Sequence, residues 1–347
     1  PYPYSIVLGL TLLLQFYMGY MISIFVVLYA FYYVSPRLSI EGTWKEKLKH
    51  YVRPLWKAFV YSVLGAATAS ILLVPVFFNL LESKGQIGGA MTFSFAFQIN
   101  PLDILSKLSI GGFDNASGWS AGPNLPNIYI GALGFIGYIL FLTSTKIAKE
   151  RKWAAGGVTL VFLVSFVNEF VSKIWHMGQN PAGFFFRFSW IFSFFMLILA
   201  YQVLKEKIEI SRKGKLLAAA VLVLSAIYLY TKDFTYLPKT QPEVLTQFIT
   251  NHFVMFVVLL IIGTAAGFYL YWDRSLKTKK EKKIVLLIAI SIILVLAGLL
   301  LTGFLFSRVV LTLIIYLAVL ALLRPRMTRL AVVLLSTITI VELGYNA

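Results

Sequence analysis

The chain has 347 residues, of which 59% are hydrophobic and 13% are charged, whereas soluble domains carry about 25% charged residues. Its formal net charge is +17, and it contains no cysteine. Together these values exclude an ordinary soluble domain, a disulfide framework and a metal site built on thiolates.

Apolar runs recur along the whole chain, and a membrane-spanning helix needs about 20 such residues. The candidate segments are 5–34, 59–81, 128–146, 155–175, 184–204, 216–231, 253–272, 284–303, 306–323 and 330–343. The sequence therefore predicts an all-α fold, a polytopic bundle of about ten transmembrane helices that forms a single transmembrane domain over residues 1–347.

The two ends of the chain have features of their own. The segment 5–34 is too long for one plain span, and Gln15 and Gly19 interrupt it, so we expect a half-helix followed by a full helix. The chain opens on Pro1, and its last apolar run is followed by ELGYNA. We therefore expect the chain to be a piece of a longer protein.

The basic residues predict the orientation of the helices. The connections 35–58, 146–153, 205–215, 273–283 and 324–329 hold 24 of the 31 Lys and Arg residues. Lys and Arg stay on the cytoplasmic side, which leaves 82–127, 176–183 and 232–252 on the outer side of the membrane. Blocks such as KTKKEKK are typical of topology determinants and of contacts with anionic membrane lipids. The positive charge thus needs no nucleic-acid partner.

The longest outer loop, 82–127, contains the carboxylates that could act in catalysis. Asp103 lies in NPLDILSKL, where a short interfacial helix is predicted to start at Pro101, and Asp114 lies in GGFDNASGW. Either carboxylate could serve as a general base. The alternative for each is an ordinary turn-forming role, and Asp103 is expected to form a solvated pair with Lys107.

The stretch VNEFVSKIWHMGQNPAGFFFRFSW, residues 167–190, places ionisable groups among apolar ones. On a continuous helix, Glu169, Lys173 and His176 fall within an arc of about 60°. Charged groups at membrane depth are costly and usually face a cavity or pathway. Three interpretations stay open: an ion pair of Glu169 with Lys173 that braces the bundle, the wall of a polar cavity, or a proton relay.

Arg187 follows the turn GQNPAGFFF and is expected one turn into the next helix. Its planar guanidinium suits phosphate oxygens, so with Lys173 and His176 it could bind a phosphate at the outer membrane boundary. The alternative is an arginine that extends its charge to the interface.

Other motifs are weaker. Gly131, Gly134 and Gly137 form a close-packing face for another helix, and no P-loop is present. In QFYMGYM, Tyr17 and its polar neighbours could line a cavity or belong to an interfacial aromatic belt. The three scattered histidines have no zinc spacing, so we assign no metal site and no cofactor.

Three long stretches are similar to the bacterial YfhO family of multi-pass membrane proteins. They are QFYMGYMISIFVVLYAFYY, NPLDILSKLSIGGFDNASGWSAGPNLPNIYIGAL and FVNEFVSKIWHMGQNPAGFFFRFSWIFSFF. The resemblance is clear over about residues 10 to 205 and rests on hydropathy elsewhere. Members of this family resemble glycosyltransferases of the GT-C type.

The resemblance implies a polyprenyl-phosphate sugar as donor and a cell-envelope polymer such as lipoteichoic acid as acceptor, on the outer face of the membrane. On this hypothesis, the donor phosphate would be bound by Lys173, His176 and Arg187, and these side chains would be oriented by Glu169, Gln179 and Asn180. The catalytic carboxylate would be Asp114 or Asp103. The sugar pocket would be lined by Phe113, Asn115 and Trp119. No acidic residue precedes Glu41. We therefore expect the aspartate that GT-C enzymes usually have in their first outer loop to lie outside this chain.

The main competing hypothesis is a polytopic transporter or lipid flippase, in which the polar stretch forms an intramembrane pathway. A third hypothesis is a non-catalytic assembly subunit. Transporters often contain internal repeats and broken helices in matching positions. No internal repeat is found in this sequence, which favours the enzyme.

Overall fold

A computed structural model describes residues 2–39, 42–82, 94–108, 125–178, 185–206, 212–231, 304–323 and 329–346, and most of these residues are helical. Eight of the ten predicted apolar segments fall on described helices, and 253–272 and 284–303 lie outside the described residues. The all-α prediction is thereby confirmed for this part of the chain.

Few of the described helices are long and apolar enough to cross a membrane. By length and hydropathy, Phe16–Arg37 is one helix among the described residues that could cross a bilayer. A second candidate is the pair Trp44–Thr68 and Ser70–Val76, which is bent by 74°. Four shorter apolar helices are Tyr2–Leu14, Gly131–Thr143, Ser189–Lys205 and Ala331–Leu343. A total of about ten spans stays a prediction.

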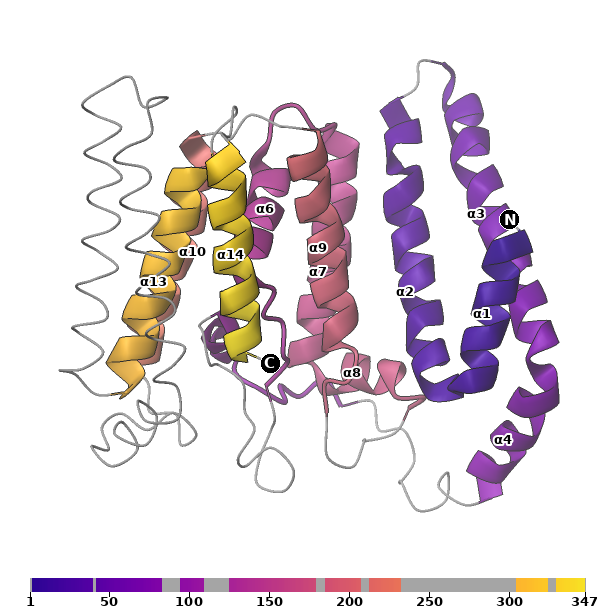
Figure 1. Ribbon diagram of the computed structural model, residues 1–347. Coiled ribbons are helices and arrows are strands. Elements are labelled where there is room, and N and C mark those ends of the chain that lie inside the picture. Colours follow the sequence, from indigo (N-terminus) through magenta and orange to yellow (C-terminus); the bar gives the residue numbers. More distant parts are fainter. Residues whose placement is uncertain are drawn as a thin grey trace, which may run out of the picture. The chain divides into compact units, whose positions relative to one another are not determined.

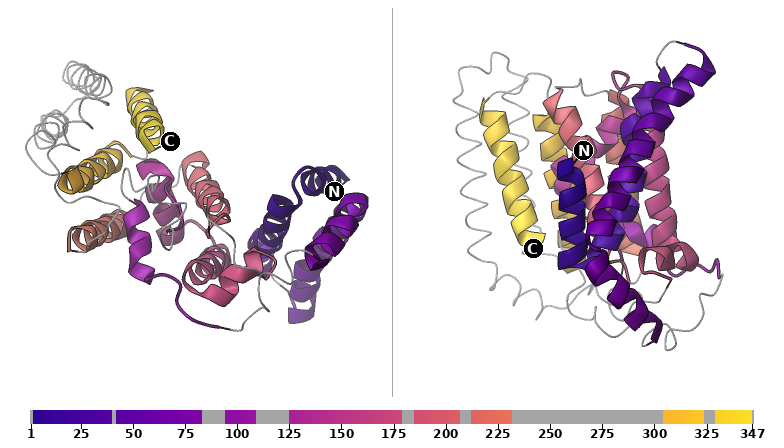
Figure 2. Two further views of the ribbon diagram at one scale, coloured as in Figure 1. Left: turned by 90° about the horizontal axis from the view of Figure 1, so that it is seen from below. Right: turned by 90° about the vertical axis from the view of Figure 1, so that its right-hand side faces the viewer.

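The chain divides into two compact units, and the first contains residues 1–103, 118–128 and 145–195. Its helices are α1 (Tyr2–Leu14), α2 (Phe16–Val34), α3 (Trp44–Thr68), α4 (Ser70–Glu82), α7 (Lys149–Val167), α8 (Glu169–Trp175) and the start of α9 (Ser189–Lys205), with a 3-10 helix η1 (Ser35–Ser39). Figure 1 shows α1 beside α2 and α3, which it also contacts. The left view of Figure 2 shows these helices, in indigo and purple, nearly end-on.

The first helix is interrupted where the sequence predicts. Gln15 leaves the helical conformation with φ −153° and ψ 86°, so the chain forms the short α1 and the full-length α2. Close packing of α1 on α3 depends on Gly65, because a Cβ there would come within 2.8 Å of the Ser5 carbonyl oxygen. A hydrogen bond between the hydroxyls of Tyr4 and Ser62, and one from the Ser5 hydroxyl to the carbonyl of Tyr61, complete this contact.

Aromatic side chains hold α2, α7 and the start of α9 together. Phe25 of α2 lies 6.3 Å from Phe162 of α7 and 6.1 Å from Phe195 of α9, measured between ring centroids. Tyr32 meets Phe195 edge-on at 5.5 Å. Pairs at these separations add about 0.5–1.5 kcal/mol each beyond the burial of their area. Aromatic side chains, which are abundant in the sequence, thus form much of the core of the first unit.

The second unit contains residues 104–117, 129–144 and 196–347. Its described helices are α6 (Gly131–Thr143), the rest of α9, α10 (Arg212–Thr231), α13 (Phe304–Leu322) and α14 (Arg329–Asn346), and the 3-10 helix η2 (Pro101–Leu108) leads into it. The predicted glycine face on α6 is confirmed: a Cβ at Gly137 would lie 2.8 Å from the Cβ of Ala200, and one at Gly134 would lie 3.2 Å from Leu197. The helices α6 and α9 therefore approach closely at these glycines.

Two charged side chains of the second unit, Lys215 and Glu342, bond to backbone atoms of other helices or their ends. The ammonium group of Lys215 donates to the carbonyls of Leu320 and Leu323, at 2.9 and 3.3 Å, at the C-terminal end of α13. Glu342 of α14 is 2% exposed, and its carboxylate accepts a hydrogen bond from the Tyr129 hydroxyl. It also accepts one from the backbone N–H of Ala132, whose nitrogen lies 2.9 and 3.0 Å from the two carboxylate oxygens. A carboxylate at the N-terminus of α6 is favourably placed in the field of that helix.

Candidate functional site

The site begins at a break between α7 and α8. The segment 155–175 was expected to be one helix, but Asn168 leaves the helical conformation with φ −97° and ψ 126°. Its side chain accepts a hydrogen bond from the N–H of Val171 at 3.1 Å and so caps α8. In Figure 1 the short α8 lies crosswise at the end of α7. The polar residues therefore lie on a separate short helix, and the prediction of a single continuous helix was wrong.

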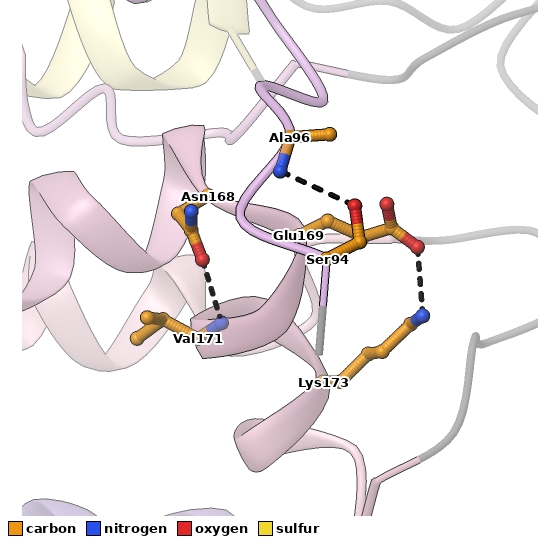
Figure 3. A network of polar contacts seen from close by, with 6 residues as sticks. All are labelled: Ser94, Ala96, Asn168, Glu169, Val171 and Lys173. Atoms are coloured by element: carbon orange, nitrogen blue, oxygen red, sulfur yellow. Dashed lines mark hydrogen bonds and ion pairs between the residues drawn. The ribbon is translucent and has the colours of Figure 1, made fainter. Parts of the chain in front are cut away.

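A distant segment supplies the backbone partners that make this break possible. The N–H of Gln98 donates to the carbonyl of Val167 at 2.9 Å, and the N–H of Glu169 donates to the carbonyl of Ala96 at 3.1 Å. The side-chain amide of Gln98 donates to the carbonyl of Phe166 at 3.0 Å. Helix ends leave such groups without intrahelical partners. Figure 3 shows the 94–96 segment passing beside Asn168 and Glu169.

Glu169 and Lys173 form an ion pair, which was one of the three interpretations of this stretch. The Lys173 ammonium lies 2.7 Å from a carboxylate oxygen of Glu169, and the two side chains are 7% and 30% exposed (Figure 3). Because the lysine is buried, the carboxylate balances its charge at close range. Lys173 therefore contributes little net positive charge by itself.

His176 follows α8 and contacts residues on both sides. Its Nε2 lies 2.8 Å from the carbonyl oxygen of Phe185, so this nitrogen must be the one that donates. Its Nδ1 then accepts a hydrogen bond from the hydroxyl of Tyr17 on α2. Burial, aided by the nearby charge of Arg187 and opposed by the bond to Phe185, lowers the pKa of His176 to about 4. The imidazole is therefore neutral near pH 7.

Arg187 is an exposed cation close to His176 and Tyr17. It lies in the turn just before α9, and not one turn into the helix as expected, and Phe186 and Phe188 on either side of it are buried. Its guanidinium carbon is 5.4 Å from the centre of the Tyr17 ring. Such a cation–π contact stabilises the position of an exposed arginine by about 0.5–1 kcal/mol. Tyr17 thus links His176 and Arg187 through its hydroxyl and its ring.

Trp175 fixes α8 and the Arg187 turn against α7. Its indole stacks on Phe188 at 4.8 Å and on Phe162 at 5.1 Å, and its N–H donates to the Ser165 hydroxyl at 2.9 Å. The tryptophan is 2% exposed. A large buried aromatic with a satisfied N–H is a rigid anchor. The Tyr17–His176–Arg187 group, defined by these three side chains, therefore has a well-packed base.

The whole chain matches one known protein family. Residues 1–347 match the family described as "Bacterial membrane protein YfhO". The chain belongs to the YfhO family. No curated protein and no solved structure matches it. The YfhO match extends beyond the region of about residues 10–205 on which the resemblance was clearest, and it identifies a bacterial membrane protein.

Several residues proposed for the YfhO-family site lie outside the described residues. They are Phe113, Asp114, Asn115, Trp119, Gln179 and Asn180. Asp103 is described: it lies in η2, which starts at Pro101 as predicted, and its N–H donates to the Asn100 carbonyl at 2.9 Å. The expected solvated partner, Lys107, is only 2% exposed, so that expectation was wrong. Within the described ranges, no three His, Asp or Glu side chains gather as metal ligands would.

Sequence reasoning overlooked two residues that build the site. Gln98 closes the end of α7, and Trp175 anchors α8, yet neither stands out in an apolar, aromatic-rich chain. Tyr17 had been considered as a cavity residue or an aromatic-belt residue, and it bonds His176. A polar residue in an otherwise apolar helix was the available indication for Tyr17.

Acidification is expected to destabilise this YfhO-family protein through His176. Because its pKa is about 4 in the folded protein and ordinarily about 6.5, only the unfolded state takes up a proton between these values. Stability should be full above pH 6.5 and fall by up to about 3 kcal/mol as the pH drops to 4. Thermal unfolding in detergent, followed by tryptophan fluorescence, measures this.

The matched variants are His176→Gln and His50→Gln. His50 is an exposed histidine on α3, so its replacement should leave the pH dependence unchanged. His176→Gln should flatten the curve between pH 6.5 and 4 while lowering stability at pH 7. Equal pH profiles for the wild type and His176→Gln would contradict a buried neutral imidazole.

Proposed function

We propose that this protein is a membrane glycosyltransferase that moves a sugar from a polyprenyl-phosphate donor to a cell-envelope polymer such as lipoteichoic acid, outside the cytoplasmic membrane. The observation that supports it is the exposed Arg187 held over Tyr17, beside the neutral His176, in a bacterial membrane protein of the YfhO family. This group of residues would bind the phosphate of the donor.

The donor has an anionic head and a long apolar tail. An arginine provides two parallel donors for phosphate oxygens and keeps its charge at every physiological pH. Arg187 is exposed at the start of the apolar helix α9, a suitable place for a head group whose tail stays in lipid. Lys173, balanced by Glu169, and His176, neutral and bonded to Tyr17, would act mainly by positioning.

The transfer itself needs a base. The acceptor hydroxyl oxygen would attack the anomeric carbon, the bond from that carbon to the phosphate oxygen would break, and the phosphate would leave with the electron pair. The hydroxyl proton would pass to a carboxylate, for which Asp114 or Asp103 is proposed. Phe113, Asn115 and Trp119 would contact the sugar, and Gln179 and Asn180 would orient the phosphate. Ala96 and Gln98, which belong to the predicted outer loop, are bonded to the junction of α7 and α8, and this supports a role for that loop beside the phosphate site.

A second candidate is a transporter or lipid flippase. The observation in its favour is the presence of interrupted helices, at Gln15, at Asn168 and at the 74° bend between α3 and α4. Broken helices are typical of substrate sites in secondary transporters. Both functions would use the same cation, but only one cleaves the donor.

The full-length protein in lipid nanodiscs distinguishes the two. A nanodisc has no separate compartments, so transfer can be observed there but transport cannot. With a polyprenyl-phosphate donor carrying a radiolabelled sugar and lipoteichoic acid as acceptor, label should appear in the polymer and free polyprenyl phosphate should accumulate. Intact donor in nanodiscs, together with movement of intact donor across the bilayer of proteoliposomes, would support the flippase and reject the transferase.

A further inference from the structure

The first half of α3 is built from two parallel stripes of side chains. Residues four apart lie on one face of a helix, each shifted by about 40°. The apolar stripe consists of Trp44, Leu48, Val52 and Trp56, and the basic stripe consists of Lys45, Lys49, Arg53 and Lys57. Each stripe covers an arc of about 120°, and the two adjoin along the helix. This is the pattern of a helix that lies in a membrane interface.

The apolar stripe is exposed although it belongs to a well-packed unit. Trp44 is 69% exposed and Trp56 is 62% exposed, and Leu48 and Val52 are exposed as well. Helix α1 contacts the second half of α3, at Tyr61, Ser62 and Gly65. The first half instead meets η1, where Arg37 donates to the carbonyl of His50 at 3.3 Å. The stripe therefore faces outward.

Few acidic residues accompany the basic stripe in this half of α3. Residues 44–57 contain five Lys or Arg and one acidic residue, Glu46. The carboxylate of Glu46 accepts hydrogen bonds from the N–H and the hydroxyl of Thr43, at 2.9 and 3.0 Å, and so closes the start of the helix. All four side chains of the stripe are exposed. The surface is thus strongly positive next to an exposed apolar face.

We propose that the first half of α3 is a docking surface for anionic phospholipids, with its apolar stripe among the acyl chains and its basic stripe on the phosphates. An acidic protein would match the charge equally well. The lipid surface is favoured because the same helix continues into the apolar half of α3, and because tryptophans at both ends of the stripe suit the headgroup boundary.

The absence of cysteine allows a clean test. The full-length protein with Val52→Cys, labelled with an environment-sensitive fluorophore, is placed in nanodiscs of phosphatidylcholine with or without about 30% phosphatidylglycerol. Lipids with a nitroxide near the headgroup quench a label that enters the interface. We expect quenching to be roughly twofold greater with phosphatidylglycerol, and to fall at high salt because salt screens charge at the surface.

Two charge-matched variants decide the outcome. Replacing Lys45, Lys49, Arg53 and Lys57 together by glutamine should remove the effect of phosphatidylglycerol. Replacing Lys149, Lys205, Arg212 and Lys213, which are exposed on other helices, should leave it intact. Equal quenching in both lipids, or an unchanged effect in the stripe variant, would overturn the proposal. A label that stays in water in every lipid would also overturn it and would favour an acidic protein as the occupant.

Discussion

Replacing Arg187 by alanine is expected to reduce sugar transfer by a factor of about 10² to 10³. The size of the loss follows from removing one charged donor from an anion whose charge grows as the sugar leaves. Folding should be little affected, because the side chain is exposed and a cation–π contact such as the one with Tyr17 contributes about 1 kcal/mol at an exposed site. The nanodisc assay with radiolabelled donor measures the rate, and tryptophan fluorescence on heating measures the stability.

Two further variants make the Arg187 result specific. Arg187→Lys keeps the charge but loses the planar pair of donors, so about a tenth of the activity should remain. Arg212→Ala removes an exposed arginine at the start of α10 and should behave as wild type. If Arg187→Ala transfers sugar at the normal rate, the phosphate site has to be sought elsewhere in the molecule.

Replacing Glu342 by alanine is expected to lower the free energy of unfolding by about 3 kcal/mol. The change would leave the buried N–H of Ala132 and the hydroxyl of Tyr129 without their charged acceptor, at the N-terminus of α6. It would also weaken the contact between α14 and α6, two helices that are far apart in the sequence. Thermal unfolding in detergent and the yield of folded protein both report the loss.

The glutamine variant tests whether charge or shape matters at Glu342. Glu342→Gln keeps one acceptor oxygen and the volume of the side chain, so about half of the loss is expected. Glu206→Ala, at an exposed glutamate just beyond α9, is the control and should be within about 0.5 kcal/mol of wild type. A Glu342→Ala protein as stable as this control would show that α14 is held by apolar packing alone.

Hydropathy and a few polar or small residues were enough to predict the local features. Helix formation in the eight described segments follows from their apolar runs, since a chain in lipid must satisfy its backbone internally. Gln15 interrupts the first run, and the break lies there. Gly137 meets Ala200, as a glycine face predicts, because a missing Cβ permits close approach whatever the partner is.

The candidate site was predicted only in part. The sequence brought Glu169, Lys173, His176 and Arg187 into one group, and the described contacts confirm the ion pair of the first two. It did not reveal that His176 is bonded at both nitrogens and neutral, since this depends on Tyr17, 159 residues earlier in the chain. It also gave no reason to expect Lys107 to be buried.

By itself, the sequence determined that the described segments are helical and that the first helix is interrupted at Gln15. Only the tertiary structure decided that the helix after Lys149 breaks at Asn168, because the groups that satisfy its end come from Gln98 and Ala96. Local patterns fix a helix through bonds between near neighbours. A break, a protonation state or a buried carboxylate such as Glu342 depends on partners supplied by distant parts of the chain.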